Sequence, residues 1–438
     1  MSESIERVGA ARDTLRRYWA GRRTLLLVQT FNATVGTTMR ELASFGAEVR
    51  GVVTANPPGH DAPEVPHVHV CGSLSTAEFD QWLQDPPPDF TRWLDELDPR
   101  REWTFLGTTF THTSEVCGRR VHGWRRPEWA RLEDKTVIDG LWRQVGVPAP
   151  RHVVSDVDDP RIPAFVRELD NGAGVVLAMD STNGFVGDAK GLRWVRTAGE
   201  LGTALEACRT SANRLRVAEF VPGVPCSVLG MVLADGVAVF DPLEIVTLRD
   251  RTRAGLVFCG SSTHWRPDGE QLRHYTRLAG EELAASVGYR GLFSVDGILG
   301  ADGFVATELN PRHASGLGLR AGWPEFPLYS FQRGVQEGLR GLFDLGHRHV
   351  EAAFRAVVRE TPSLAVRVPA PGASGDGRFV TGTGQIVDYR VAGGAAWLDR
   401  VSPPAPGGVV GPAAAEVATA LGAGALTSFR DDYPEEQP

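Results

Sequence analysis

The feature that most constrains this chain is a predicted β-hairpin in its second half. Two strand-like runs, 292–299 and 304–310, flank a short segment ending in Gly303, which suits a three-residue loop with glycine in the left-handed conformation. In the register that such a loop imposes, Asp296 lies directly opposite Glu308. Two carboxylates that face each other across a sheet repel unless a cation lies between them, so the hairpin predicts a cation site.

Further oxygen and guanidinium groups follow this pair. Asn310 comes two residues after Glu308 and therefore shares its face of the strand, and Arg312 follows a proline. Hard oxygen ligands from few residues suit Mg²⁺, which leaves positions for phosphate oxygens. A nearby arginine would neutralise charge on a transferred phosphoryl group. The sequence predicts a magnesium–phosphate site with Asp296, Glu308 and Asn310 as metal ligands; the alternative is a solvated, exposed sheet face.

Composition makes the lysines informative. Lys135 and Lys190 are the only lysines among 46 basic residues, and arginine does not freely replace the compact ammonium group at a tight phosphate site. Lys135 directly follows Asp134, the predicted N-cap of a helix that ends at Gly146. A cation in the first turn opposes the helix dipole, so Lys135 is expected to face an anion elsewhere. The alternative is that both lysines survive by chance in an arginine-rich composition.

A glycine-rich loop carries the second lysine. Residues 180–191 connect two predicted strands and include Gly184, Gly187 and Lys190. Exposed backbone amides and an ammonium group in such a loop suit a cover over phosphate. The same pattern is also typical of a plain hairpin, so the loop alone does not decide between the two.

The N-terminal part of the chain predicts a layered α/β unit. Strand-like runs at 24–28 and 47–54 flank a helical pattern at 33–45. The turn between the first strand and the helix lacks a GxGxxG sequence, so no dinucleotide site is expected there. Residues 85–99 are rich in proline and aspartate and are predicted to form a surface loop.

These motifs, in this order, resemble the ATP-grasp superfamily. Residues 295–297 followed by 307–312 resemble its metal-binding end. Residues 133–135 resemble the segment whose lysine reaches the nucleotide phosphates, and the loop 180–191 occupies the place of the flexible phosphate loop. Residues 218–223 resemble the interdomain strand that holds adenine through backbone groups.

The resemblance implies an α/β (α+β) architecture in which a Rossmann-like domain precedes a two-lobed ATP-grasp domain. The expected divisions are 1–130 for the Rossmann-like domain, 131–222 for the N-terminal lobe, 223–345 for the C-terminal lobe with the metal site, and 346–438 for a small C-terminal region with a disordered tail. The role of that last region stays open between a cap near the site and an oligomer contact.

The resemblance also implies chemistry. Such ligases phosphorylate a carboxylate with Mg-ATP to an acyl phosphate, which an amine then attacks. The implied function is an ATP-dependent carboxylate–amine ligase that forms an amide or dipeptide bond and releases ADP and phosphate. Analogy alone favours a role in secondary metabolism. Two alternatives stay open: a carboxylate–thiol ligase of the same fold, and a non-catalytic ATP-binding regulatory protein.

The resemblance assigns roles residue by residue. Arg312 and Lys135 are the expected catalytic residues. Relatives carry a ribose-binding acid at the position of Pro225, and some carry an anion-binding arginine at the position of Ser294. Arginines of a neighbouring loop therefore become candidates for binding the anion. The remaining assignments are nucleotide binding by Lys135, Lys190, Gly184, Gly187, Glu219, Phe220 and Val221, and substrate binding by His313, Ser315, Gly316, Arg249 and Arg251.

Charge and composition exclude other classes. The net charge of −8 argues against a dedicated nucleic-acid binder. No apolar run approaches the roughly 20 residues of a membrane span, and the first 23 residues lack the apolar core of a secretory signal. Five cysteines without a CxxC pair fit a reducing, cytoplasmic environment. The expected partners are small-molecule carboxylate and amine substrates, and a homodimer stays open.

Overall fold

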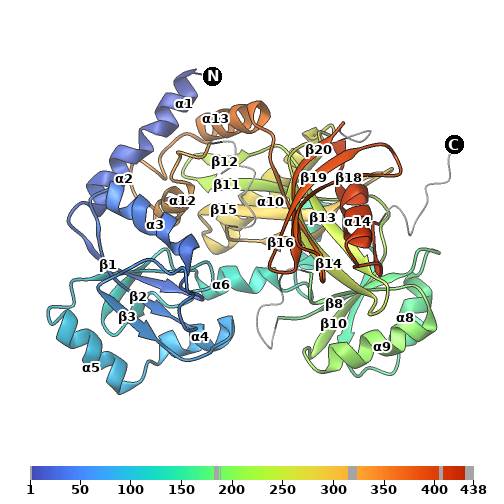
Figure 1. The fold of residues 1–438 in the computed structure, drawn as a ribbon, viewed down its shortest axis with the longest axis horizontal. Helices are drawn as coiled ribbons and strands as arrows, with labels where there is room; N and C mark the ends of the chain where they lie inside the picture. Colours follow the sequence, from blue (N-terminus) through green and yellow to red (C-terminus); the bar gives the residue numbers. More distant parts are fainter. Residues whose placement is uncertain (1, 182–186, 188, 314–322, 404–407, 430–438) are drawn as a thin grey trace.

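The computed structural model describes residues 2–181, 187, 189–313, 323–403 and 408–429. Figure 1 shows two sheet-containing units at opposite lower sides of the molecule, one from the N-terminal residues and one from residues near 150–220. Strands from the rest of the chain form a longer sheet above and between them (Figure 1).

The N-terminal unit is a six-stranded sheet with the order β3-β2-β1-β4-β6-β5, in which only β5 runs antiparallel to its neighbour. Leu25 and Leu27 pack beneath α4 and α5, whereas Leu26 points to the other face toward α2 and α3. Both faces are therefore covered, as is typical of parallel sheets. The elements are β1 (Arg23–Val28), β2 (Glu48–Thr54), β3 (His67–Val70), β4 (Thr104–Leu106), β5 (Glu115–Val116), β6 (Arg119–His122), α1 (Ser2–Gly9), α2 (Ala11–Trp19), α3 (Ala33–Ser44), α4 (Thr76–Gln84) and α5 (Pro88–Leu97).

Two predictions for this unit have different outcomes. The strand–helix–strand order expected over residues 24–54 is confirmed by β1, α3 and β2. The loop predicted at 85–99 is wrong, because α5 begins there at Pro88. Proline in the first turn loses no intrahelical hydrogen bond, and the helix buries Phe90 and Leu94 against the sheet.

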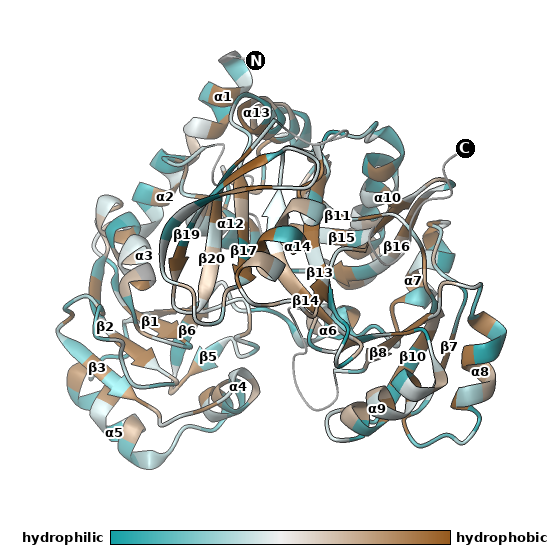
Figure 2. Ribbon diagram, turned by 45° about the vertical axis from the view of Figure 1, so that its right-hand side comes forward, coloured by the Kyte–Doolittle hydropathy of each residue, from teal (hydrophilic) through white to brown (hydrophobic). Residues whose placement is uncertain are grey.

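The second unit is a small antiparallel sheet. Strand β10 lies between β7 and β8, and β9 pairs with the outer edge of β8. One face buries Leu177, Leu215 and Val217 beneath α8 and α9. Figure 2 shows that α8 and α9 mix apolar and hydrophilic residues, as helices covering a sheet do. The elements are β7 (His152–Asp156), α8 (Ile162–Leu169), β8 (Val175–Met179), β9 (Leu192–Val195), α9 (Ala198–Arg209) and β10 (Arg214–Glu219).

The long sheet has the order β16-β15-β11-β13-β14-β17-β20-β19-β18. The strands of the C-terminal region extend this sheet, because β17 pairs with β14 and β21 pairs with β13. Helix α10 packs on β11 and β12, and α13 packs on α1. The elements are β11 (Val224–Leu233), β12 (Gly236–Val239), β13 (Leu243–Asp250), β14 (Gly255–Ser262), α10 (Glu270–Val287), β15 (Gly291–Gly300), β16 (Gly303–Asn310), α12 (Leu328–Gln336), α13 (His347–Glu360), β17 (Leu364–Pro369), β18 (Gly375–Val380), β19 (Ile386–Ala392), β20 (Ala395–Ser402), α14 (Gly411–Ala420) and β21 (Leu426–Thr427).

The segment between the two lower units differs from the predicted helix. It contains α6 (Pro127–Ala130), the short 3₁₀ helix η1 (Arg131–Glu133) and α7 (Asp139–Val145). Asp134 is not an N-cap, because its carboxylate accepts hydrogen bonds from the backbone and hydroxyl of Thr136. Such a local turn competes with helix formation, so Lys135 lies in a turn before α7. The predicted end of the helix at Gly146 is confirmed, with φ of 70°.

Within the described part of the chain, no helix is both long and apolar enough to cross a bilayer.

Candidate active site

The hairpin β15–β16 places two carboxylates face to face. Asp296 pairs with Glu308, which confirms the predicted juxtaposition. The predicted loop is wrong by one residue: Gly300 pairs with Gly303, so the loop holds two residues. A bulge at Thr307 adds the residue that the loop lacks and restores the register at the carboxylates.

The Asp296 carboxylate is held by three donors. The hydroxyl groups of Ser227 and Ser294 lie 2.6 and 3.0 Å from Oδ1, and the Asn310 amide lies 2.9 Å from Oδ2. Burial and the neighbouring Glu308 carboxylate raise the pKa of Asp296 to about 6. Both serines are functional candidates, since their hydroxyls fix the carboxylate in place; the sequence predicts no role for Ser227, and it marks Ser294 only as the residue that replaces an arginine.

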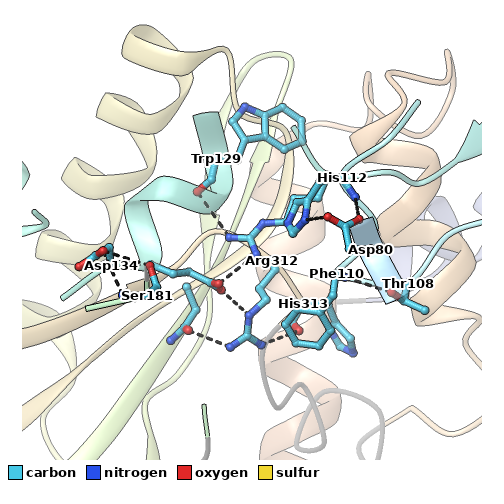
Figure 3. A network of polar contacts seen from close by, with 12 residues as sticks. Asp80, Thr108, Phe110, His112, Trp129, Asp134, Ser181, Arg312 and His313 are labelled. Atoms are coloured by element: carbon cyan, nitrogen blue, oxygen red, sulfur yellow. Dashed lines mark hydrogen bonds and ion pairs between the residues drawn. The ribbon is translucent and has the colours of Figure 1, made fainter. Parts of the chain in front are cut away.

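Lys135 lies directly against the hairpin. Its ammonium nitrogen is 2.7 Å from Oε1 of Glu308. The preceding residue, Asp134, accepts hydrogen bonds from the backbone and hydroxyl of Ser181 at 3.2 and 3.1 Å (Figure 3). Since Ser181 lies two residues after the end of β8, these bonds tie the Lys135 turn to the start of the glycine-rich loop.

Arg312 belongs to a chain of alternating charges. Its Nε donates to Glu133, whose other oxygen accepts from Arg125 at 3.0 Å. Burial alone would raise the pKa of Glu133, but the two guanidinium groups outweigh it and hold that pKa below its ordinary value. Arg312 also donates to Asn310 at 3.0 Å and lies over the ring of Phe110 (Figure 3). The guanidinium group is thereby fixed beside the facing carboxylates.

A cavity of about 230 Å³, here called the hairpin cavity, is lined by Lys135, Arg312 and the facing carboxylates of Asp296 and Glu308. One part of its wall is charged and another is apolar, with Leu256, Phe258 and Phe429 among the apolar side chains. A charged end beside an apolar end suits a ligand that joins an anionic group to a flat ring. The residues predicted from sequence that the cavity brings together are Lys135, Gly187, Asp296, Glu308, Asn310 and Arg312.

An aromatic stack backs the apolar end of the hairpin cavity. The rings of Trp194 and Phe220 lie 3.9 Å apart with 5° between their planes, and Phe429 stacks on Trp194 at 5.5 Å. Phe429 follows β21 near the end of the chain and lines the cavity itself. No sequence motif pointed to Phe429.

The interdomain strand residues do not line the hairpin cavity. The Glu219 carboxylate accepts from the backbone and side chain of Arg151 at 2.9 and 2.7 Å. The backbone N–H of Phe220 donates to Gly174, and its carbonyl accepts from Asn171. Together with Val221, these positions are absent from the residues around the cavity, so their assignment to nucleotide binding stays a prediction.

Three basic residues predicted to bind ligands also lie away from the cavity wall. Lys190 and Arg251 are exposed. Arg249 is buried, donates to Glu200 at 2.7 Å and stacks over Trp194 at 4.8 Å. The structure therefore gives Arg249 a packing role beside the aromatic stack. Of the other predicted residues, Gly184, Ser315 and Gly316 lie outside the described residues.

A second cavity, of about 270 Å³, adjoins the first at Arg312. It lies between the N-terminal unit and α12, and we call it the Arg312–Arg333 cavity. His313, predicted to bind substrate, lines it and packs edge-on against Tyr329 at 4.5 Å. Arg312 is thus shared by both cavities.

The hairpin cavity fits a divalent cation by the chemistry of its donors. Two carboxylates face each other there, and the Lys135 ammonium group lies against one of them, Glu308. The Asn310 amide oxygen lies beside them and accepts a hydrogen bond from Arg312. No group of three or more His, Cys, Asp or Glu residues placed to hold a metal occurs among the described residues. Mg²⁺ needs only a few oxygen ligands from the protein when phosphate oxygens supply the others.

The structure is similar to solved structures of several enzymes. N5-carboxyaminoimidazole ribonucleotide synthetase in its ADP complex has a TM-score of 0.52 and 13% identity, over 87% of this chain and 93% of that chain. The Aspergillus clavatus carboxyaminoimidazole ribonucleotide synthase with ATP has a TM-score of 0.52 and 16% identity, over 81% and 84%. The biotin carboxylase domain of Hydrogenobacter thermophilus 2-oxoglutarate carboxylase, with MgADP, ADP and bicarbonate, has a TM-score of 0.54 and 14% identity, over 85% of each chain.

These likenesses show the fold. The chain has the ATP-grasp fold, which confirms the fold class that the sequence resemblance implied. No protein-family model matches the sequence, and a search of curated proteins gives no match.

Proposed function

Starting from the ATP-grasp fold, we propose that this protein is an ATP-dependent carboxylate–amine ligase that forms an amide or dipeptide bond and releases ADP and phosphate. The observation that carries the proposal is the position of Arg312, whose guanidinium group lines both the hairpin cavity and the cavity beside it. An arginine that lines two cavities is placed to bind a group while it is transferred from a ligand in one cavity to a ligand in the other. The solved structures of similar fold that contain ADP, ATP or MgADP support nucleotide binding in this fold.

Each residue has a role in this proposal. Bound Mg²⁺, held by Asp296, Glu308 and Asn310, would neutralise phosphate charge. Lys135 exchanges its contact with Glu308 for a nucleotide phosphate. Arg312 holds the transferring phosphoryl group between the two cavities, where its bonds to Glu133 and Asn310 fix its orientation.

The reaction has two steps. A carboxylate oxygen of the acid substrate attacks the γ-phosphorus of ATP, the bond to the β-phosphate oxygen breaks, and ADP leaves. The amine nitrogen then attacks the acyl carbon, phosphate leaves, and the nitrogen loses a proton. The acid substrate lies in the Arg312–Arg333 cavity, since that cavity meets the hairpin cavity at the phosphoryl-binding arginine.

Other expectations from the sequence stay predictions. They are the role of Lys190 and of the 180–191 loop, a thiol in place of an amine as acceptor, a cytoplasmic location, a homodimer and a place in secondary metabolism. A catalytically silent ATP-binding protein is the alternative that the first experiment must separate from a ligase.

The test is ADP release from Mg-ATP across a panel of amino acids, singly and in pairs, with mass spectrometry of the products. We expect release that depends on one pair and a product one water lighter than the two substrates. AMP with pyrophosphate would contradict the acyl-phosphate route. Mg-dependent ATP binding by calorimetry without turnover for any pair would favour the silent ATP-binding protein.

A further inference from the structure

Arg333, on α12, presents a mostly buried guanidinium group without an anionic partner. Its Nη2 donates to the carbonyl oxygen of Gly107 at 2.8 Å. Among the described residues, no carboxylate lies within ion-pair distance of it. Its aliphatic stem passes over Gly123, where a Cβ would come within 2.7 Å of the stem carbons. The lack of a side chain at Gly123 therefore leaves room for the Arg333 side chain, whose charge is not balanced by an ion pair within the described residues.

Other buried arginines of this chain are neutralised. Arg216 makes two bonds to Asp139, at 2.6 and 2.7 Å, and Arg119 is bonded to Asp98 at 2.8 Å. A buried charge without a partner is costly, and burial lowers the pKa of Arg333, against the opposing influence of Glu41 and Tyr329. Glu41 lines the adjoining cavity with Arg333 and accepts hydrogen bonds from Ser330, and it forms no ion pair with Arg333 within the described residues.

Arg333 stands where two cavities meet. The Arg312–Arg333 cavity lies on one side, and a cavity of about 260 Å³ lined by the end of β1 and by α3 lies on the other. Thr108, Tyr329 and Arg333 line both cavities. The guanidinium group can thus be reached from the cavity that also contains the phosphoryl-binding Arg312.

We propose that Arg333 binds a second, non-reacting anionic group of the substrates, so that the ligase acts on a substrate pair carrying a carboxylate besides the one that is activated. This inference rests on the proposed function and specifies its substrate class. The second carboxylate belongs either to the acid, which is then a dicarboxylate, or to the amine, which is then an amino acid. In either case Arg333 supplies a positive charge and the N–H groups other than the one bonded to Gly107, and a guanidinium group matches a carboxylate in shape and charge.

The experiment is thermal unfolding of the full-length protein at fixed ionic strength with matched probes. Succinate is compared with succinamate, glutarate with glutaramate, glycine with glycinamide, and L-alanine with L-alaninamide. Each pair has nearly the same shape and differs in one charge. Inorganic sulfate serves as the smallest anionic probe. The variants are Arg333→Met, which keeps an apolar stem, and Arg340→Met as the matched control, because Arg340 is exposed just beyond α12.

We expect at least one of these carboxylates to stabilise the wild type more than its amide partner does. That preference should persist in Arg340→Met and disappear in Arg333→Met, with affinity for that carboxylate reduced about tenfold or more. A preference confined to the dicarboxylates places the second anion on the acid substrate, and one confined to the amino acids places it on the amine. Ligand-free Arg333→Met should unfold at the wild-type temperature or above it, because a buried unpaired charge has been removed.

Three results would overturn the proposal. They are a preference for a carboxylate over its amide that survives in Arg333→Met, the absence of any anion-dependent shift in the wild type, sulfate included, and ligand-free Arg333→Met that unfolds well below the wild type. Mg-ADP is tested in parallel on all three proteins. If Mg-ADP fails to stabilise any of them while the carboxylate preference depends on Arg333, the proposed ATP reaction fails and the anion site stands.

Discussion

The two cavities that meet at Arg312 differ in how their charges are balanced. In the hairpin cavity, the Asp296 and Glu308 carboxylates are matched by Lys135 and Arg312. In the Arg312–Arg333 cavity, arginines line the wall without an acidic side chain among the lining residues. A balanced site is suited to taking up a cation and an anion together. A site with excess positive charge is suited to an anion alone, and this contrast separates a nucleotide–metal site from a substrate site.

The largest effect is expected at the carboxylate that faces Asp296. Glu308→Gln should lower ADP release by about 1,000-fold, because the metal loses a charged ligand worth several kcal/mol in the transition state. The fold should remain, as judged by an unchanged thermal transition. Asp302→Asn in the exposed hairpin loop is the matched control, and comparable losses in both variants would show a general effect on the hairpin.

The charge balance next to the hairpin cavity can be broken at Glu133. Glu133→Gln leaves the guanidinium groups of Arg125 and Arg312 without their shared anion, so the free energy of unfolding should fall by about 3 kcal/mol. Urea unfolding measures this change. Glu128→Gln, at an exposed position of α6, should change stability little; equal stability of the two variants would mean that the charge chain contributes nothing to the fold.

Lys135 tests whether the hairpin cavity needs a compact cation. Lys135→Arg should lower kcat/KM for ATP by about 10- to 100-fold, because the longer, planar guanidinium group does not take the same place beside Glu308 and a nucleotide phosphate as the compact ammonium group. The same change at the exposed Lys190 should cost less. Full activity of Lys135→Arg, or equal losses at both positions, would remove the distinction drawn between the two lysines.

The smallest expected effect concerns the apolar end of the hairpin cavity. Phe429→Ala removes one ring of the stack with Trp194, so KM for ATP should rise about 3- to 10-fold with kcat nearly unchanged. Trp397→Ala, at an exposed aromatic position of β20, is the control. A lower kcat with unchanged KM would argue that Phe429 acts elsewhere than at the nucleotide.

The same contrast explains what the sequence could predict. Asp296 and Glu308 lie on one hairpin, so local pairing rules placed them together even though the loop was one residue shorter than expected and a bulge restored the register. The helix predicted at Asp134 failed because the aspartate side chain bonds to Thr136 instead of capping a helix. The fold class followed from the order of motifs, and the solved structures confirm it.

The Arg312–Arg333 cavity had no such local signal. Arg333 bonds to Gly107, a residue 226 positions earlier in the chain, and nothing in an arginine-rich sequence distinguishes an unpaired arginine from a paired one. Phe429 reaches the hairpin cavity only because β21 pairs with β13. Both contacts depend on how distant segments pack, and packing of that kind cannot be read from spacing along the chain.

The most direct test of the proposed ligase reaction uses hydroxylamine as a small amine acceptor, so that only the acid needs to be found. Wild type and Glu308→Gln are incubated with Mg-ATP, hydroxylamine and each acid of a panel that includes monocarboxylates and dicarboxylates, and the nucleotide and hydroxamate products are measured together. The acyl-phosphate route predicts ADP, phosphate and a hydroxamate in equal amounts from wild type with at least one acid, and about 1,000-fold less of each from Glu308→Gln. Hydroxamate formed with AMP and pyrophosphate, or formed equally by the variant, would contradict it.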